Sequence, residues 1–149
     1  MRLINFSRIA TVLLLITCSL QTWAADSIYN QDGLAIGGYD PVAYFTLGRP
    51  VWGRSNITHT WKNVTWQFDS EKHRDAFAAN PEKYAPQYGG YCAYAAAKGS
   101  LAPTDARAWA IVDGKLYLNY SPAIQERWKS NMFGYISRAD KKWPALENK

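Results

Sequence analysis

The amino-acid sequence predicts a small α+β domain, and three features support this class. Residues 56–68 and 109–120 each hold two short apolar–polar alternations around a two-residue turn, which is the pattern of a β-hairpin. Other segments begin with a capping residue and carry apolar side chains at helical spacing. Because strands and helices are grouped unevenly instead of alternating as βαβ units, they fit two hairpins with short helices packed around them.

The first 24 residues predict a secretory signal peptide. Arg2 and Arg8 precede an apolar run at residues 9–20, and small residues stand at the positions before a cut after Ala24. The run is too short to cross a bilayer as a helix, so we expect no membrane span in the mature chain. Residues 25–149 are expected to form one domain in the periplasm or outside the cell.

Charge and cysteine content narrow the class of partner. Loss of the signal peptide lowers the formal charge from +5 to +3. The sequence also has no cluster of Lys and Arg residues of the kind that indicates a nucleic-acid partner. Cys18 belongs to the leader, and lipid attachment there is disfavoured because Thr17 suits that cleavage poorly. The mature chain then keeps Cys92 without an internal disulfide partner, so its stability must come from packing.

The first helix and hairpin follow from local signals. Asp40 and Pro41 predict a helix start, and Gly48 marks its end. A turn at Lys62-Asn63 then sets the register of the hairpin at residues 56–68. On one face we expect three pairs: Trp61 with Val64, His59 with Trp66, and Ile57 with Phe68.

The middle of the chain predicts three short helices. Ser70 caps a helix over residues 71–79, which Pro81 stops, and residues 81–84 add one more turn. Beyond the Gly89-Gly90 pair, residues 92–98 are alanine-rich and end at Gly99. Cys92 would then lie in the first turn of a helix, where a thiolate is favoured.

The last third predicts a second hairpin and two helices. Strands at 109–112 and 116–120 flank Asp113-Gly114, a strong hairpin turn. Ser121 and Pro122 begin a helix with Trp128 on its inner face. A short helix from about 134 to 142 precedes Trp143-Pro144.

Three motifs, in order, resemble the YHS-domain family: GYDPVAYF at 38–45, WQFDSEKHRDAF at 66–77 and NPEKYAPQYGGYCAYA at 80–95. The match covers about residues 36–99, and residues 108–144 resemble the tail of the exported, stand-alone branch. The resemblance implies a role in metal handling. In the metal-associated branch, cysteines occupy the positions that read Ala43, Asp69 and His73 here, so the zinc-like site of those relatives does not carry over directly.

A metal site can still be formulated from the residues present. Asp69 and His73 are four residues apart across a helix start and can face one point, with Cys92 completing the site and His59 as an outside candidate. Such a donor set suits Cu or Zn. The plainer alternative is that Asp69 favours the helix start, His73 packs beside Phe77 and Cys92 is a buried apolar residue.

A second hypothesis is a pocket for a small planar molecule around the Gly89-Gly90 turn. Its lining would consist of seven aromatic residues: Tyr39, Tyr44, Trp66, Tyr84, Tyr88, Tyr91 and Tyr94. The same rings would also serve as ordinary core. A third hypothesis is a thiol-dependent enzyme that uses Cys92 with His59 or His73 as base. Because no established catalytic motif occurs, we expect an exported, non-enzymatic binding protein for a metal ion or a small molecule.

Overall fold

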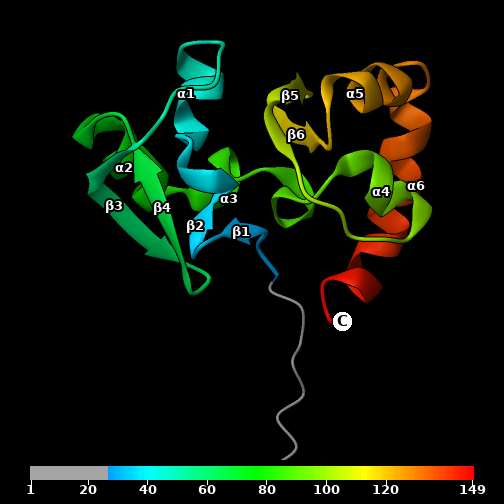
Figure 1. The fold of residues 1–149 in the computed structure, drawn as a ribbon, viewed down its shortest axis with the longest axis horizontal. Helices are drawn as coiled ribbons and strands as arrows, with labels where there is room; N and C mark the ends of the chain where they lie inside the picture. Colours follow the sequence, from blue (N-terminus) through cyan, green and yellow to red (C-terminus); the bar gives the residue numbers. More distant parts are fainter. Residues whose placement is uncertain (1–26) are drawn as a thin grey trace, which may run out of the picture.

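The computed structural model describes residues 27–149, so the expected signal peptide, its cut after Ala24 and Cys18 lie outside the described residues. The fold is α+β, as predicted (Figure 1). The strands are β1 (Asn30–Gln31), β2 (Leu34–Ala35), β3 (Arg54–Trp61), β4 (Val64–Phe68), β5 (Asp105–Val112) and β6 (Lys115–Asn119). The helices are η1 (Ile36–Gly38), α1 (Pro41–Thr46), α2 (Glu71–Ala79), α3 (Pro81–Tyr84), η2 (Gln87–Gly90), α4 (Ala93–Lys98), α5 (Pro122–Lys129) and α6 (Met132–Leu146).

The first half of the fold is built on a four-stranded sheet in the order β1-β2-β4-β3. Along β4, Val64, Trp66 and Phe68 are buried and alternate with half-buried residues. Their side chains pack under α2, where the ring of Phe77 lies 4.9 Å from Trp66 and 5.2 Å from Phe68. Each such buried side chain contributes about 1.5–3 kcal/mol, so α2 is held on the sheet mainly by aromatic packing.

The register of the β3–β4 hairpin is partly as predicted. Trp61 pairs with Val64 and His59 with Trp66, across a turn in which Lys62 and Asn63 both have positive φ. The predicted pairing of Ile57 with Phe68 is wrong, because Phe68 pairs with Arg54. The register shifts between Arg54 and Thr58, and a bulge of this kind adds residues to one strand only.

The predicted helix starts at Asp40 and Ser70 agree with the structure, whereas Cys92, expected in the first turn of its helix, is the N-cap residue before α4. The Asp40 side chain accepts hydrogen bonds from the backbone N–H groups of Val42 and Ala43, and the Ser70 side chain accepts one from the backbone of His73. The extra turn at residues 81–84 is present as α3, and α4 ends at Gly99 in the left-handed conformation. Caps and glycine stops therefore fixed these boundaries correctly.

The last third contains longer elements than predicted. Strand β5 begins at Asp105, four residues before the predicted strand at 109–112, and α6 runs from Met132 to Leu146 through Pro144. The α6 residues that pack on the second core recur at helical spacing through Trp143 and Leu146. Burial of that face outweighs the backbone hydrogen bond that proline removes.

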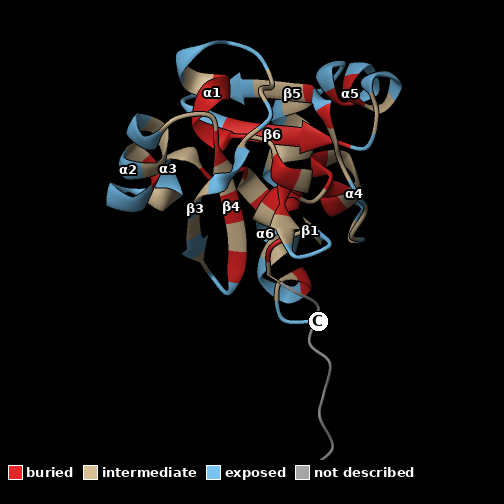
Figure 2. Cartoon of the chain, turned by 60° about the vertical axis from the view of Figure 1, so that its left-hand side comes forward, coloured by how far each residue is buried: buried red, intermediate tan, exposed pale blue. Residues whose placement is uncertain are grey.

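Two hydrophobic cores meet at strand β6, which is buried along most of its length (Figure 2). Leu116 and Leu118 belong to the core under the four-stranded sheet, whereas Tyr117 belongs to the core between α4, α5 and α6. Both faces of β6 are therefore covered, and this strand joins the two groups of elements that lie side by side in Figure 1.

Candidate functional site

Cys92, the residue on which the metal and thiol hypotheses depended, is buried at the N-cap of α4. Its side chain is 1% exposed. The Sγ atom accepts a hydrogen bond from the Tyr120 N–H at 3.3 Å and donates to Asn119 Oδ1 at 3.7 Å. The thiol thus connects the start of α4 to the end of β6 and is closed to solvent.

The four predicted metal ligands have separate partners. Cys92 contacts Asn119, while Asp69 lies 3.6 Å from the guanidinium of Arg54. The His59 ring packs edge-on at 6.1 Å from Phe77, and His73 is bonded to Asp40. Within residues 27–149, no group of three or more His, Cys, Asp or Glu side chains is arranged to hold a metal ion. The structure does not bring Asp69, His73, Cys92 and His59 together.

Asp40 and His73 form a largely buried, hydrogen-bonded pair that the sequence did not predict. Asp40 is fully buried, and its Oδ2 lies 2.6 Å from His73 Nδ1 and 2.9 Å from the Asp69 backbone N–H. Its Oδ1 accepts from the N–H groups of Val42 and Ala43. One carboxylate therefore connects the start of α1, the end of β4 and the first turn of α2.

Thr46 extends this pair into the order hydroxyl, imidazole, carboxylate, which hydrolases use for nucleophilic attack. The Thr46 hydroxyl donates its proton to the Val42 carbonyl at 3.1 Å. The same hydroxyl lies 3.1 Å from His73 Nε2, and His73 Nδ1 contacts the Asp40 carboxylate. Because the Thr46 proton is directed to the Val42 carbonyl, His73 is not positioned to take it, and the three residues are assigned a structural role.

The seven predicted pocket aromatics are distributed over both cores. Only Tyr88 among them lines the cavity described below. Tyr44 and Trp66 are buried, and Tyr39 stacks on Trp52 at 3.9 Å. The remaining rings pack against neighbours in pairs: Tyr84 with Phe45, Tyr91 with Tyr29 and Trp143, and Tyr94 with Tyr135. For these six, the core alternative describes the contacts better than a shared pocket.

A cavity of about 340 Å³ lies beside the Gly89-Gly90 turn. The β3–β4 turn, the α3–η2 segment, the start of β6 and the end of α6 all contribute to its wall. Its lining consists of Ser27, Ile28, Trp61, Lys62, Glu82, Ala85, Pro86, Gln87, Tyr88, Gly89, Lys115, Trp143 and Glu147. The sequence predicted the Gly89-Gly90 side of this cavity, but not Trp61 or Trp143, which come from distant segments.

Close backbone packing forms one side of the cavity. Tyr29 N–H donates to the Gly89 carbonyl at 2.8 Å, and a Cβ atom on Gly89 would clash with the carbonyl oxygen of Ser27. Gly89 also has a φ of 60°, in the left-handed region. A glycine is required there on both counts, and the N-terminal segment is thereby fixed against η2.

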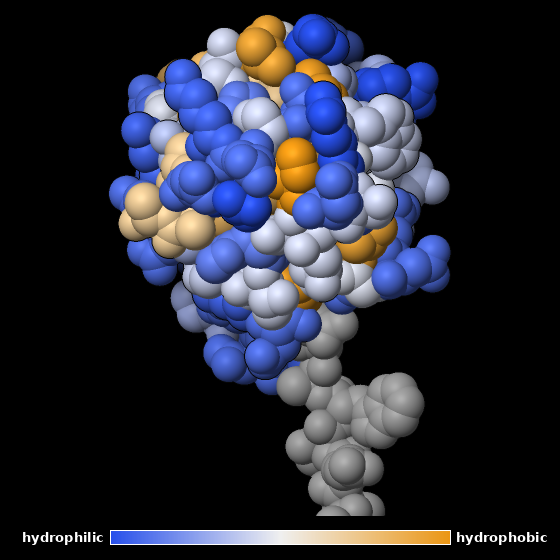
Figure 3. All heavy atoms as spheres, turned by 90° about the vertical axis from the view of Figure 1, so that its left-hand side faces the viewer, coloured by the Kyte–Doolittle hydropathy of each residue, from blue (hydrophilic) through white to orange (hydrophobic). Residues whose placement is uncertain are grey.

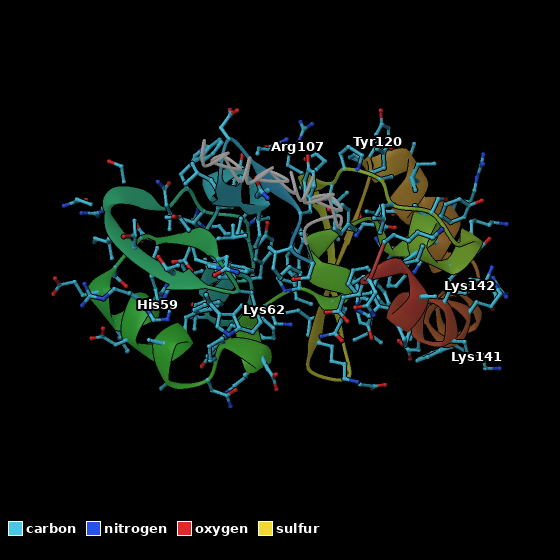
Figure 4. The ribbon with its side chains drawn as sticks, turned by 90° about the horizontal axis from the view of Figure 1, so that it is seen from below. His59, Lys62, Arg107, Tyr120, Lys141 and Lys142 are labelled. Atoms are coloured by element: carbon cyan, nitrogen blue, oxygen red, sulfur yellow. The ribbon has the colours of Figure 1, made fainter. Side chains whose placement is uncertain are left out.

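Aromatic rings and charged side chains form the rest of the wall. The rings of Tyr88 and Trp143 lie 5.8 Å apart, and Lys62 lies 4.9 Å from the Trp61 ring and 3.8 Å from the Glu147 carboxylate. Figure 4 shows Lys62 near the boundary between the two halves, with His59 over the first half. The cavity thus lies where the two halves meet, a frequent position for ligand sites.

Two of the charged side chains in this wall, Glu82 and Lys115, are available to a ligand. Neither Glu82 nor Lys115 forms an ion pair with another side chain in the described part of the chain. Burial, together with the hydrogen bond to Asp140 at 2.8 Å, raises the pKa of Tyr88 well above its ordinary value. Its phenol is therefore neutral and bonded away from the cavity, which leaves the ring as an apolar surface.

Comparison with known protein families, with curated proteins and with solved structures gives no match. The resemblance to YHS domains therefore stays a prediction. Over residues 27–149, no helix has both the length and the apolar character needed to cross a membrane.

Proposed function

We propose that this protein is an exported, non-enzymatic binding protein that holds a small planar molecule in the cavity between its two halves. The observation that supports this proposal is the solvent-open cavity of about 340 Å³ with Trp61, Tyr88 and Trp143 in its wall. Ligand sites of small molecules begin at about 300 Å³ and combine apolar surface with a few polar anchors.

The lining residues define the chemistry of the ligand. Three aromatic rings favour a flat ligand, while Lys115 and Glu82 offer one positive and one negative anchor without a partner of their own. The lining supplies neither imidazole nor thiol, which favours binding over nucleophilic catalysis. A planar ring with at least one charged substituent fits these requirements.

A pair of neighbouring substitutions tests the site. Glu82 lines the cavity, whereas Lys83, the next residue, lies over the Tyr84 ring outside it. We expect the mature chain to bind 8-anilinonaphthalene-1-sulfonate, an aromatic anion with a planar naphthalene ring, at one site in isothermal titration calorimetry. Glu82→Trp fills the cavity and should weaken binding by about tenfold or more, while Lys83→Trp should bind like the wild type. Equal affinities, or no saturable binding, would refute the proposal.

Native mass spectrometry of the protein purified from its own host would identify a bound molecule directly. The same preparation tests the earlier expectation of Cu or Zn near Cys92. Titration of either ion into the tag-free protein should give no one-to-one complex if the cavity, and not a metal centre, is the functional site. A stoichiometric complex that Cys92→Ala removes would instead restore the metal hypothesis.

A further inference from the structure

Trp52 is unusual because it is 62% exposed although it is one of the largest apolar side chains. Its ring stacks on Tyr39, with 3.9 Å between centroids and 26° between planes. Tyr39 therefore covers one face of the indole, and the exposed area belongs to the rest of that ring. The open aromatic face is available to a ligand, and covering it would be favourable.

The backbone holds this stack rigidly. Tyr39 and Trp52 form an isolated antiparallel bridge, the Asp40 N–H donates to the Val51 carbonyl at 2.9 Å, and the Gly53 N–H donates to the Gly38 carbonyl at 2.9 Å. A Cβ on Gly53 would lie 2.5 Å from the Gln67 carbonyl carbon, so the segment is pressed against β4. A fixed exposed ring loses little conformational entropy when a ligand covers it.

Paired arginine and aspartate side chains lie beside the stack. Arg107 donates to Asp105 through Nε at 3.0 Å and Nη2 at 2.7 Å, and the two residues lie two positions apart on β5. Asp105 first, and Tyr39 more weakly, raise the pKa of Arg107, which agrees with Arg107 lying on the Tyr39 side. Arg54, two residues after Trp52, lies 3.6 Å from Asp69.

Rigid aromatic faces next to planar hydrogen-bonding groups are suited to a sugar ring. The electron-rich face of an indole attracts the C–H groups on one side of a pyranose. Guanidinium donors and carboxylate acceptors can bond to its hydroxyl groups. The guanidinium groups of Arg54 and Arg107 add hydrogen-bond donors near the stack, which suits a polyhydroxylated ligand.

We propose that the Tyr39–Trp52 stack, with Arg107 and Arg54 beside it, is a binding platform for an oligosaccharide. This platform is separate from the cavity, because Trp52, Tyr39 and Arg107 do not line the cavity. Figure 4 shows Arg107 well away from Lys62, which does line it. The face over β3 and α2 in Figure 3 shows only small, separated hydrophobic areas among hydrophilic residues, so no broad apolar surface competes there.

The experiment uses the ¹⁵N-labelled mature chain and three soluble probes: chitotriose, cellotriose and maltotriose. We expect at least one probe to shift the Trp52 indole N–H resonance in a saturable manner, with a Kd of about 0.1–1 mM. Affinities of the variants are followed by the Gly53 backbone N–H resonance, which all of them retain; Trp52→Ala should weaken binding by about tenfold or more, and Arg107→Ala by about threefold to tenfold. Trp52→Phe keeps an aromatic face and should retain part of the affinity.

A matched control is Phe133→Ala, because Phe133 on α6 is 65% exposed and distant in sequence from the platform. This variant, and Glu82→Trp in the cavity, should bind the saccharide like the wild type, so failure of the cavity and failure of the platform are distinguishable. The proposal is overturned if no probe shifts the Trp52 resonance, or if Trp52→Ala binds unchanged. Concentration-dependent slow tumbling that Trp52→Ala abolishes would assign the stack to self-association and also overturn it.

Discussion

At the scale of single residues, Asp40 connects more segments of the fold than its sequence context predicts. Its carboxylate accepts four hydrogen bonds, from three backbone N–H groups and from the His73 ring. A buried carboxylate of this kind is stable only because each of its bonds is present. Sequence reasoning identified its capping role alone, since the contacts with Asp69 and His73 exist only in the folded chain.

Asp40→Ala should therefore destabilise the protein strongly. The change removes the acceptor of three backbone N–H groups and leaves the His73 ring without its partner, so we expect a loss of about 3–5 kcal/mol in the free energy of unfolding. Urea unfolding followed by circular dichroism measures it. Asp75→Asn, at an exposed ion pair with Arg74, should cost less than about 1 kcal/mol. A similarly small loss for Asp40→Ala would contradict the proposed role.

A comparison of Gly89 with Gly48 separates two reasons why a position requires glycine, namely a positive φ and a lack of space for a Cβ atom. Both have φ near +60°, but a Cβ on Gly48 meets open space, whereas one on Gly89 meets the Ser27 carbonyl. Gly48→Ala should cost about 1–2 kcal/mol from backbone strain alone. Gly89→Ala should cost about 1–3 kcal/mol more, because Ser27 and Ile28 must move. Thermal unfolding of both variants checks this, and equal losses would mean that the N-terminal segment moves aside freely.

Tyr117 should make the free energy of unfolding fall as the pH rises. Burial, followed by the charges of Asp140 and Asp113, raises its pKa to about 12 from the ordinary value of 10. Because the folded state favours the neutral phenol, this contribution is complete below pH 10 and is lost as the pH rises through 12. Allowing for solvent screening, we expect it to be about 1–2 kcal/mol.

Tyr117→Phe isolates this effect, since no described side chain or backbone group bonds to the Tyr117 hydroxyl. The variant should match the wild type at pH 7 and lose less stability between pH 9 and about 11.5. Urea midpoints across that range measure the difference. Parallel curves for the two proteins would show that the phenol ionises equally in the folded and unfolded states.

At the scale of elements, α4 depends on small side chains. Ala96 and Ala97 are buried against the second core, and Ala139 of α6 is buried in the same cluster. These residues allow the two helices to approach closely, so larger side chains would force them apart. The alanine-rich sequence that predicted a helix thus also sets its distance from α6.

Ala96→Leu should cost about 1–3 kcal/mol through overpacking, although leucine is a good helix former. Ala95→Leu, on the same helix but half-buried, should change the stability by less than about 0.5 kcal/mol. Chemical denaturation compares the two. Were Ala96→Leu also neutral, the contact between α4 and α6 would have room that the packing does not indicate.

Local signals predicted most element boundaries, and non-local packing explains the exceptions. Caps at Asp40, Ser70 and Ser121 act within one turn, so the chain near each residue was sufficient to identify them. The continuation of α6 through Pro144 depends on Trp143 packing on Tyr88, 55 positions earlier in the chain. The β3 register depends on a bulge that no turn residue announces.

The candidate site was less predictable for the same reason. The sequence singled out the Gly89-Gly90 turn and Tyr88, which do border the cavity, but its other walls come from the β3–β4 turn, β6 and α6. Cys92 looked reactive because a helix N-terminus favours a thiolate. Its burial follows from the long-range contacts with Asn119 and Tyr120, which no local pattern reveals.

At the scale of the whole molecule, β6 makes the two cores interdependent. Strand β6 is buried on both faces, with Leu116 and Leu118 in one core and Tyr117 in the other. Neither group of elements can keep its packing if this strand leaves. We therefore expect residues 27–149 to unfold as one cooperative unit, as single domains of this size usually do.

Leu118→Ala tests this coupling, because the substitution touches only the first core. It should lower the free energy of unfolding by about 2–4 kcal/mol. Hydrogen exchange followed by mass spectrometry should show the same decrease in peptides from β4–α2, in the first core, and from α4–α6, in the second, since both open only when β6 is lost. If only the β4–α2 peptides were to exchange faster, the two halves would be separate folding units, and ligand binding in the cavity between them would then stabilise their contact and not a common core.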